Sequence, residues 1–236
     1  MILPVDIHTH RQPQTPGEAI VNCFPETFIP QAGGWYSVGI HPWHIASVFR
    51  NKAENPPFDN EQTMPEGEEL RRCITMSSEG HCFENLLRHP QVLAVGEAGL
   101  DKLADTPLNV QMEIFRYQAR LAEEINKPLI IHLVKAVDEL LKLKSEIHPV
   151  NPWIIHGFRG KAALAEEYIR HGFYLSFGEK YQEEALRTIP PERLFLETDE
   201  STLPVDTLYE RVAEVRRVSV EELRNTLRKN IDETFL

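Results

Sequence analysis

The chain has 236 residues, of which 42% are hydrophobic and 26% are charged. This balance is typical of a globular protein that is long enough for one sizeable core, and we expect a single domain over residues 1–236. The formal net charge is −11, and such a charge argues against broad, sequence-independent coating of nucleic acid. No apolar stretch approaches the roughly 20 residues that span a bilayer, so we expect no membrane segment. No pattern indicates an obligate protein partner.

The cysteines and the N-terminal residues bear on the compartment. Cys23, Cys73 and Cys82 are odd in number and contain no CxxC pair, which is typical of a reduced protein. The first residues carry neither a basic leader nor a long apolar core, so we expect no secretion signal. Together these features predict a cytoplasmic location.

Eight short runs rich in Val, Ile, Leu or aromatic residues predict strands. They lie near residues 2–8, 18–23, 35–41, 91–97, 128–132, 152–156, 172–177 and 193–198. Amphipathic patterns predict helices at residues 109–126, 136–146, 161–171, 179–188, 205–217 and 220–235. Alternating strands and helices favour a parallel sheet, and continuous apolar runs are typical of strands covered on both faces. The expected fold is α/β, a single (β/α)8 barrel at the small end of its size range.

The front third departs from an ideal barrel. Few residues separate His10 from His41, and with Pro42 counted they contain five prolines. We therefore predict that the first crossover helix is missing. Residues 51–84, after the third strand, are polar and have few periodic apolar positions, which predicts an insertion or mobile loop.

Residues of the types that commonly bind metal ions stand at or just after five of the predicted strands. They are His8, His10, Glu97, His132, His156 and Asp199. Because His8 and His10 are two residues apart, both side chains point to the same side of a strand. Any one of these histidines alone also fits a hydrogen-bonded core or strand-end position. Their joint occurrence at one end of successive strands predicts a shared metal centre, because buried charges are costly unless paired or metal-bound.

The two carboxylate positions differ in how well the sequence assigns them. Glu97 lies between glycines directly after an apolar strand, which lets the backbone approach the carboxylate closely; a surface turn is the alternative. Near residue 199, the spacing of two puts Glu197 and Asp199 on the same side of the strand. Either of these two could be the ligand.

The order and spacing of the motifs resemble those of the TatD-type metal-dependent hydrolases, deoxyribonuclease-like members of the amidohydrolase group. The matching segments cover nearly the whole chain: Asp6-Ile7-His8-Thr9-His10, Gly39-Ile40-His41-Pro42, Gly96-Glu97-Ala98-Gly99-Leu100-Asp101, His132, His156-Gly157-Phe158-Arg159-Gly160 and Glu197-Thr198-Asp199. The resemblance implies a (β/α)8-type barrel with two divalent ions at its C-terminal mouth. It implies that one ion is held by His8, His10 and Asp199, the other by His132 and His156, and that Glu97 bridges them. Such ligands suit Zn, Mn, Fe or Ni, and Mg also stays open.

This arrangement predicts hydrolytic chemistry. Two cations roughly 3.5–4 Å apart activate a shared water at neutral pH and neutralise charge on phosphoryl oxygens. Asp199 could orient that water and accept its proton, which makes Asp199 and Glu97 the catalytic candidates. We expect hydrolysis of phosphoester bonds, at the end of a nucleic acid or in a small nucleotide-like ester. The alternatives are hydrolysis of a C–N or carboxylic ester bond, and a non-catalytic metal-binding scaffold.

Three residues are candidates for substrate contacts. His41 matches a family histidine near the substrate. Arg159 is a phosphate candidate, and a surface ion pair is its alternative. Lys135 stands where the family usually has an Arg-Asp pair, and it offers a point charge instead of a bidentate fork; a solvated Lys is an equal alternative. The three tryptophans are more typical of core or rim packing than of base stacking, and only Trp43 is placed to line the mouth.

Overall fold

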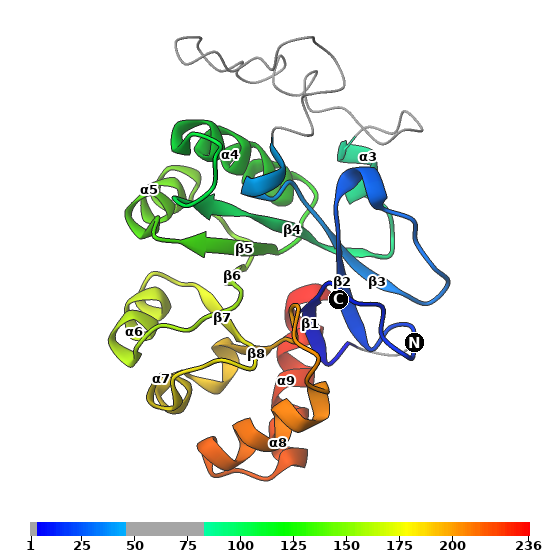
Figure 1. The fold of residues 1–236 in the computed structure, drawn as a ribbon, viewed down its shortest axis with the longest axis vertical. Helices are drawn as coiled ribbons and strands as arrows, with labels where there is room; N and C mark the ends of the chain where they lie inside the picture. The colour runs from blue at the N-terminus through cyan, green and yellow to red at the C-terminus, as the bar shows by residue number, and fades with distance from the viewer. Residues whose placement is uncertain (1–3, 46–82) are drawn as a thin grey trace.

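The computed structural model describes residues 4–45 and 83–236 (Figure 1). Their strands form one parallel sheet in the order β1 to β8. The strands are β1 (Asp6–Thr9), β2 (Ala19–Cys23), β3 (Trp35–Val38), β4 (Val92–Asp101), β5 (Leu129–Val134), β6 (Trp153–Ile155), β7 (Tyr174–Phe177) and β8 (Leu194–Leu196). The N–H of Asp199 donates to the carbonyl of His8 at 2.9 Å, which joins the chain after β8 to β1. The sheet is therefore a nearly closed barrel, and the predicted α/β barrel is confirmed.

The helices lie around this sheet (Figure 1). They are α4 (Leu108–Glu124), α5 (Val137–Ile147), α6 (Ala162–Arg170), α7 (Glu183–Thr188), α8 (Val205–Arg216) and α9 (Val220–Phe235). Each predicted helix is present, but α7 begins four residues later than predicted, because residues 178–182 form a loop at the mouth of the barrel. The Ser219 hydroxyl caps α9 by accepting the Glu222 N–H at 3.1 Å, as its sequence predicts.

The front third lacks a regular crossover. Within residues 4–45, no α-helix connects β1 to β2 or β2 to β3; the second connection contains only the 3-10 helix η1 (Pro25–Thr27). The prediction of a missing first crossover helix is confirmed. A second 3-10 helix, η2 (Pro42–His44), follows β3, and α3 (Phe83–Leu87) precedes β4. The predicted insertion at 51–84 lies outside the described residues except for its last two positions, which begin α3 and are helical instead of loop.

Two buried clusters cover the two faces of the sheet. The larger one joins strand residues such as Leu129 and Ile155 to helices α3 to α9. The smaller one contains strand residues of the opposite face, such as Ile130 and Ile154, together with two side chains of α9. This alternation along single strands identifies the smaller cluster as the barrel interior. Among the described helices, none is both long and apolar enough to cross a membrane.

Candidate metal centre

Histidines at the ends of two strands lie directly above the apolar interior of the barrel. Ile130 and Ile154 are interior residues, and His132 and His156 follow each of them by two positions. Side chains two residues apart on a strand share a face, so both imidazoles lie above the apolar interior. The parallel strands all end at this side of the barrel, which brings the predicted ligands together at its C-terminal mouth.

His8 and His10, which we call the β1 pair, face one oxygen of Glu97. Their ring centroids are 5.2 Å apart. The Nε2 atoms of His8 and His10 lie 3.4 Å and 3.5 Å from Glu97 Oε2. The two-residue spacing therefore places both rings on the same side, as predicted.

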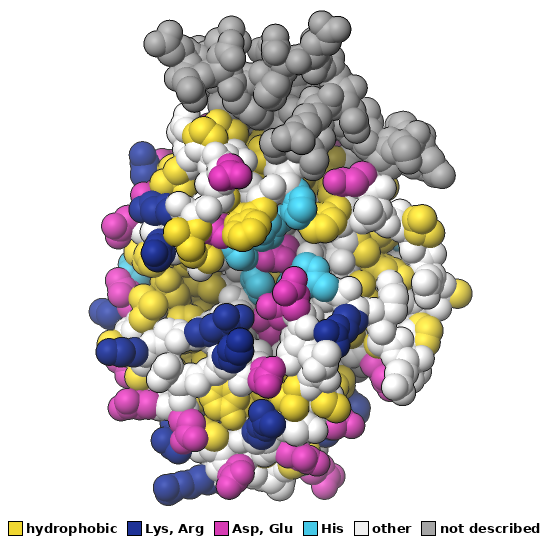
Figure 2. Space-filling view, viewed as in Figure 1, with side chains coloured by type: hydrophobic (Ala, Val, Ile, Leu, Met, Phe, Trp, Pro, Cys, Tyr) yellow, Lys and Arg dark blue, Asp and Glu magenta, His cyan; other side chains and the backbone are white. Residues whose placement is uncertain are grey.

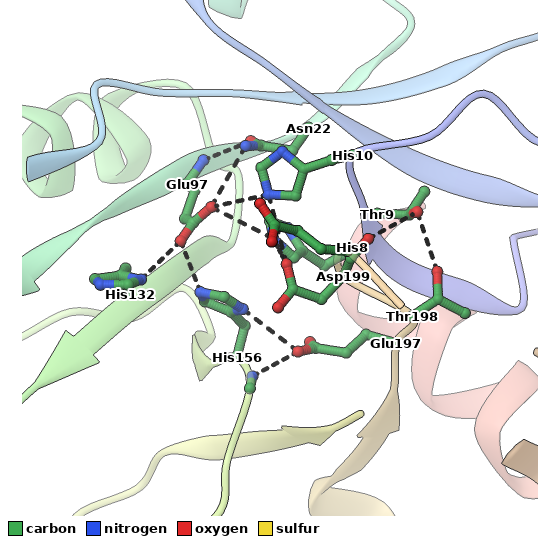
Figure 3. A network of polar contacts seen from close by, with 12 residues as sticks. His8, Thr9, His10, Asn22, Glu97, His132, His156, Glu197, Thr198 and Asp199 are labelled. Carbon is green, nitrogen blue, oxygen red and sulfur yellow. Dashed lines mark hydrogen bonds and ion pairs between the residues drawn. The ribbon is translucent and has the colours of Figure 1, made fainter. Parts of the chain in front are cut away.

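His132 and His156, which we call the β5–β6 pair, face the other oxygen of Glu97. His132 Nδ1 and His156 Nε2 each lie 2.8 Å from Glu97 Oε1. The buried Glu97 carboxylate thus has the β1 pair at one oxygen and the β5–β6 pair, together with His41, at the other (Figure 3). A carboxylate placed in this way can link two separate groups of ligands.

Asn22 on β2 holds Glu97 in place, a role that was not predicted from the sequence. Its Oδ1 accepts the Glu97 backbone N–H at 2.8 Å and the Ser37 hydroxyl at 3.2 Å. Its Nδ2 donates to Glu97 Oε2 at 3.5 Å. A buried amide in the otherwise apolar run Ala19–Cys23 was the available signal, because a buried polar side chain needs partners.

The structure separates the two acidic candidates after β8. Asp199 Oδ1 lies 3.5 Å from His10 Nε2 and 3.8 Å from His8 Nε2. Glu197 is fully buried; its Oε1 accepts the Gly157 N–H at 2.6 Å and lies 3.3 Å from His156 Nδ1. Asp199 therefore joins the β1 pair, while Glu197 contacts the outer nitrogen of His156.

Asp101 has the corresponding place behind His132. Its Oδ2 lies 3.1 Å from His132 Nε2 and accepts the Trp43 indole N–H at 2.7 Å. Its Oδ1 accepts the Leu103 backbone N–H at 2.8 Å. This role of Asp101 was not predicted from the motif that contains it. Both histidines of the β5–β6 pair thus have a second carboxylate at their outer nitrogen, an arrangement that fixes the ring and its tautomer.

Charge coupling shifts the pKa values across the site. Burial by itself would raise the pKa of Glu97, but His156, His10 and His132 hold that pKa well below its usual value. Burial would lower the pKa of His156, but Glu97 and Glu197 raise it well above its usual value. The chain alone therefore favours a Glu97 carboxylate beside a protonated His156 imidazole.

His8 supplies a test of whether a metal ion fits. Its side chain is fully buried, and neither ring nitrogen has a hydrogen-bond partner. A buried polar group left unsatisfied costs about 1–3 kcal/mol, and a cation bound to one His8 nitrogen would remove that cost at this nitrogen. His8, His10 and Asp199 offer ligand atoms within 4.8 Å of one another, as do His8, Glu97 and His156. Imidazole and carboxylate groups at this spacing suit a transition metal ion.

The three substrate candidates lie at different depths. His41 is part of the cluster, because its Nε2 lies 3.2 Å from Glu97 Oε1. Arg159 is exposed and lines two neighbouring cavities of about 330 and 360 Å³. Lys135 is exposed, and the described lining of these cavities includes Val134 but not Lys135. A role for Lys135 stays a prediction.

A parallel barrel with histidines and carboxylates at the C-terminal ends of its strands is an architecture of metal-dependent hydrolases. Residues 30–236 match the family model described as TatD related DNase. The chain belongs to this family, which confirms the resemblance inferred from its motifs.

Individual proteins agree with the family match. The metal-dependent hydrolase YabD of Bacillus subtilis is 34% identical over 175 residues, which cover 65% of this chain and 69% of YabD. The human 3'-5' RNA nuclease TATDN2 is 36% identical over 125 residues, which cover 48% of this chain but only 16% of TATDN2. The crystal structure of YJJV, a TATD homolog from Escherichia coli, has a TM-score of 0.72 at 19% identity and covers 99% of this chain and 97% of YJJV. At that identity YJJV supports the fold alone.

Proposed function

We propose that this metal-dependent hydrolase cleaves phosphoester bonds, at the end of a nucleic acid or in a small nucleotide-like ester. The observation that carries the proposal is the placement of a histidine pair at each oxygen of the Glu97 carboxylate. Two ligand groups that share one carboxylate support a two-ion site, and two-ion sites can stabilise the attacking and leaving oxygens of a displacement at phosphorus.

The proposed ligand sets follow the two histidine pairs. His8, His10 and Asp199 would hold one ion, His132 and His156 the other, and Glu97 would bridge them. When bound, divalent ions lower the pKa of a water and stabilise the charge that grows on phosphoryl oxygens. Elemental analysis of the purified protein would identify the ions among Zn, Mn, Mg, Fe and Ni. The cytoplasmic location stays a prediction from the cysteine pattern.

Residues of the chain would supply the remaining steps. Asp199 lies at the mouth with a partly exposed side chain, where its carboxylate can orient the attacking water and accept its proton. Arg159 lines cavities that also include Asp199, and its guanidinium can bind a phosphate oxygen with two parallel hydrogen bonds. His41, 3.2 Å from Glu97, would contact the substrate from the other side.

The human relative supports a nucleic-acid substrate, since its name is 3'-5' RNA nuclease TATDN2. The net charge of −11 argues for a substrate gripped locally at the mouth rather than along a long basic surface. Nuclease activity and the polarity of cleavage are therefore the properties to measure first.

The test compares the hydrolysis of different classes of bond by one metal-loaded preparation of the protein. We expect turnover of a nitrophenyl phosphodiester and of end-labelled single-stranded DNA or RNA, and no turnover by the Glu97→Gln variant. A matched panel of amides and carboxylic esters runs in parallel. Hydrolysis of amides with inert phosphoesters would reject the phosphoester proposal. Metal-loaded protein that is inactive on every panel, while a protein partner co-purifies at a fixed ratio, would favour a scaffold.

A further inference from the structure

Trp43 is an exposed aromatic residue whose ring is nevertheless held in place. Trp43 is 61% exposed, whereas Trp35 and Trp153 are 8% and 0% exposed. The Trp43 indole N–H donates to Asp101 Oδ2 at 2.7 Å, and Asp101 is only 2% exposed. A buried carboxylate thus anchors one edge of the indole while much of the side chain faces solvent. Packing does not account for such exposure of the largest apolar ring.

Trp43 lies on the rim of the candidate metal centre. The lining of a cavity of about 470 Å³ includes Phe24, Trp43 and His44 together with Glu97 and Asp199. The Phe24 and His44 rings contact each other, with centroids 4.4 Å apart. Figure 2 shows hydrophobic side chains next to the histidines at the mouth of the barrel. The cavity therefore combines an aromatic wall with the charged centre.

His41 connects the wall to the centre. Its ring centroid lies 6.4 Å from that of Trp43 and 4.4 Å from that of His132. A ligand with a flat apolar part and an anionic part would meet both surfaces at once. The chain carries a net charge of −11, and Glu200 lines this same cavity. The acidic groups would therefore repel a row of phosphates here, whereas a neutral flat ring would not be repelled.

We propose that Phe24, Trp43 and His44 form a stacking wall for the nucleobase of the nucleotide whose phosphate is hydrolysed. The inference rests on the proposed phosphoester function and adds the residues that hold the base of the substrate. Stacking on an aromatic face tolerates every base, because each base has a π-face. The wall thus supplies affinity without sequence preference, which an acidic chain cannot obtain from phosphate contacts alone.

A competing role for Trp43 is to position His132. Trp43 and His132 contact the same oxygen, Asp101 Oδ2, at 2.7 Å and 3.1 Å. Substitution of a residue that only positions His132 would change the metal content of the protein and would change kcat by the same factor for every substrate. A stacking residue would instead act on substrates according to whether they carry a base.

Tryptophan fluorescence gives a readout independent of turnover. Trp43 is the exposed member of the three tryptophans in the chain, so a stacked base should quench its emission selectively. We expect deoxyadenosine monophosphate to quench the metal-loaded protein in a saturable way, deoxyribose 5-phosphate to leave the emission unchanged, and Trp43→Phe to lose the response. Equal quenching by the sugar phosphate, no quenching by the nucleotide, or an unchanged response in Trp43→Phe would overturn the proposal.

Kinetics with paired oligonucleotides test the same wall. The two substrates differ only in whether the terminal nucleotide carries its base or is abasic. We expect wild type to prefer the intact substrate in kcat/KM by about 10–100-fold, the range that one stacked base provides. Trp43→Leu should lose most of this preference, and Trp43→Phe, which keeps a ring but not the indole N–H, should keep most of it.

Leu103→Ala is the matched control, because Leu103 is also 61% exposed and its backbone N–H contacts the same Asp101. It should keep the wild-type preference. An identical preference in wild type and Trp43→Leu would overturn the stacking wall, even if both cleave the oligonucleotides. Nucleotide-specific quenching without any phosphodiester turnover would reject the proposed function and leave the wall standing, so the two failures are distinguishable.

Discussion

The β1 pair and the β5–β6 pair face the same carboxylate but are held very differently. His132 and His156 each have a carboxylate at both ring nitrogens, with Asp101 and Glu197 at the outer ones. His8 has no hydrogen-bond partner at either nitrogen, and the side chain of His10 is 31% exposed. Each ring of the β5–β6 pair is therefore held at both nitrogens, whereas the β1 pair has only the longer contacts with Glu97 and Asp199.

For the proposed two-ion site, this difference predicts that the two ions bind with unequal affinities. A ligand already fixed by a second carboxylate loses little freedom when an ion binds, so the β5–β6 pair should bind its ion more tightly. At the β1 pair the ion itself would satisfy the buried His8 imidazole, so binding there must order the ligands as well. We expect two unequal affinities, and each prediction below tests whether the inequality follows from these contacts.

The largest effect should come from Glu97→Gln, which removes the charge shared by both pairs. We expect about two bound ions per chain to fall to one or none, together with loss of detectable hydrolysis, because the proposed bridge is lost. Elemental analysis and phosphodiester assays measure both. Glu166→Gln, at an exposed position of α6, is the control. Two ions retained in Glu97→Gln would show that the carboxylate does not link the pairs.

Asp199→Asn should be next, because in the proposed ligand sets Asp199 belongs to the β1 side. The amide cannot accept a proton, so we expect kcat to fall by about 10²–10⁴-fold, the usual contribution of a positioned general base. The tighter ion, at the β5–β6 pair, should stay bound. Single-turnover kinetics and metal content measured on one preparation check this, with the exposed Asp105→Asn as control. A wild-type kcat would remove Asp199 from the proton transfer.

The carboxylates behind the β5–β6 pair should have an intermediate effect. Asp101→Asn and Glu197→Gln are each expected to weaken the tighter ion by about 10–100-fold, as outer partners of ligating histidines usually do. The affinity at the β1 pair should change little. Titration of metal-free protein against a competing chelator resolves the two affinities. Equal weakening of both ions would contradict the assignment of these carboxylates to one pair.

The smallest effect concerns pH. In the metal-free chain, Glu97 and Glu197 raise the pKa of His156 despite its burial. The stability from this raised pKa is fully present below about pH 6.5, the unfolded value, and is lost as pH rises through the folded pKa. Metal ions require neutral imidazole, so their stabilising effect grows with pH.

Thermal unfolding between about pH 6 and about pH 8.5, with and without chelator, measures both trends. We expect the chelated protein to lose thermal stability toward the upper end of this range, and the difference from the metal-loaded protein to widen. A difference that does not change with pH would show that His156 exchanges no proton for the ion.

Local patterns in the sequence were sufficient for the elements and for most of the proposed ligands. The strands, the helices and the capped start of α9 follow from periodicity and end residues, which act within a few positions. The same-side placement of His8 and His10 follows from the two-residue period of a strand. A missing first crossover helix follows from the prolines and the short distance between His10 and His41. These properties depend on neighbours in the chain and can be read from it.

Tertiary structure decided which groups face one another. The choice between Asp199 and Glu197, the use of Asn22 to hold Glu97, and the anchoring of Trp43 by Asp101 all join residues on different strands or loops. Asn22 and Glu97 are 75 positions apart, and their contact requires the register of β2, β3 and β4 to be set first. Periodicity gives the direction of a side chain relative to its own strand. Only the closed barrel, in which distant strand ends share one mouth, determines what that side chain meets.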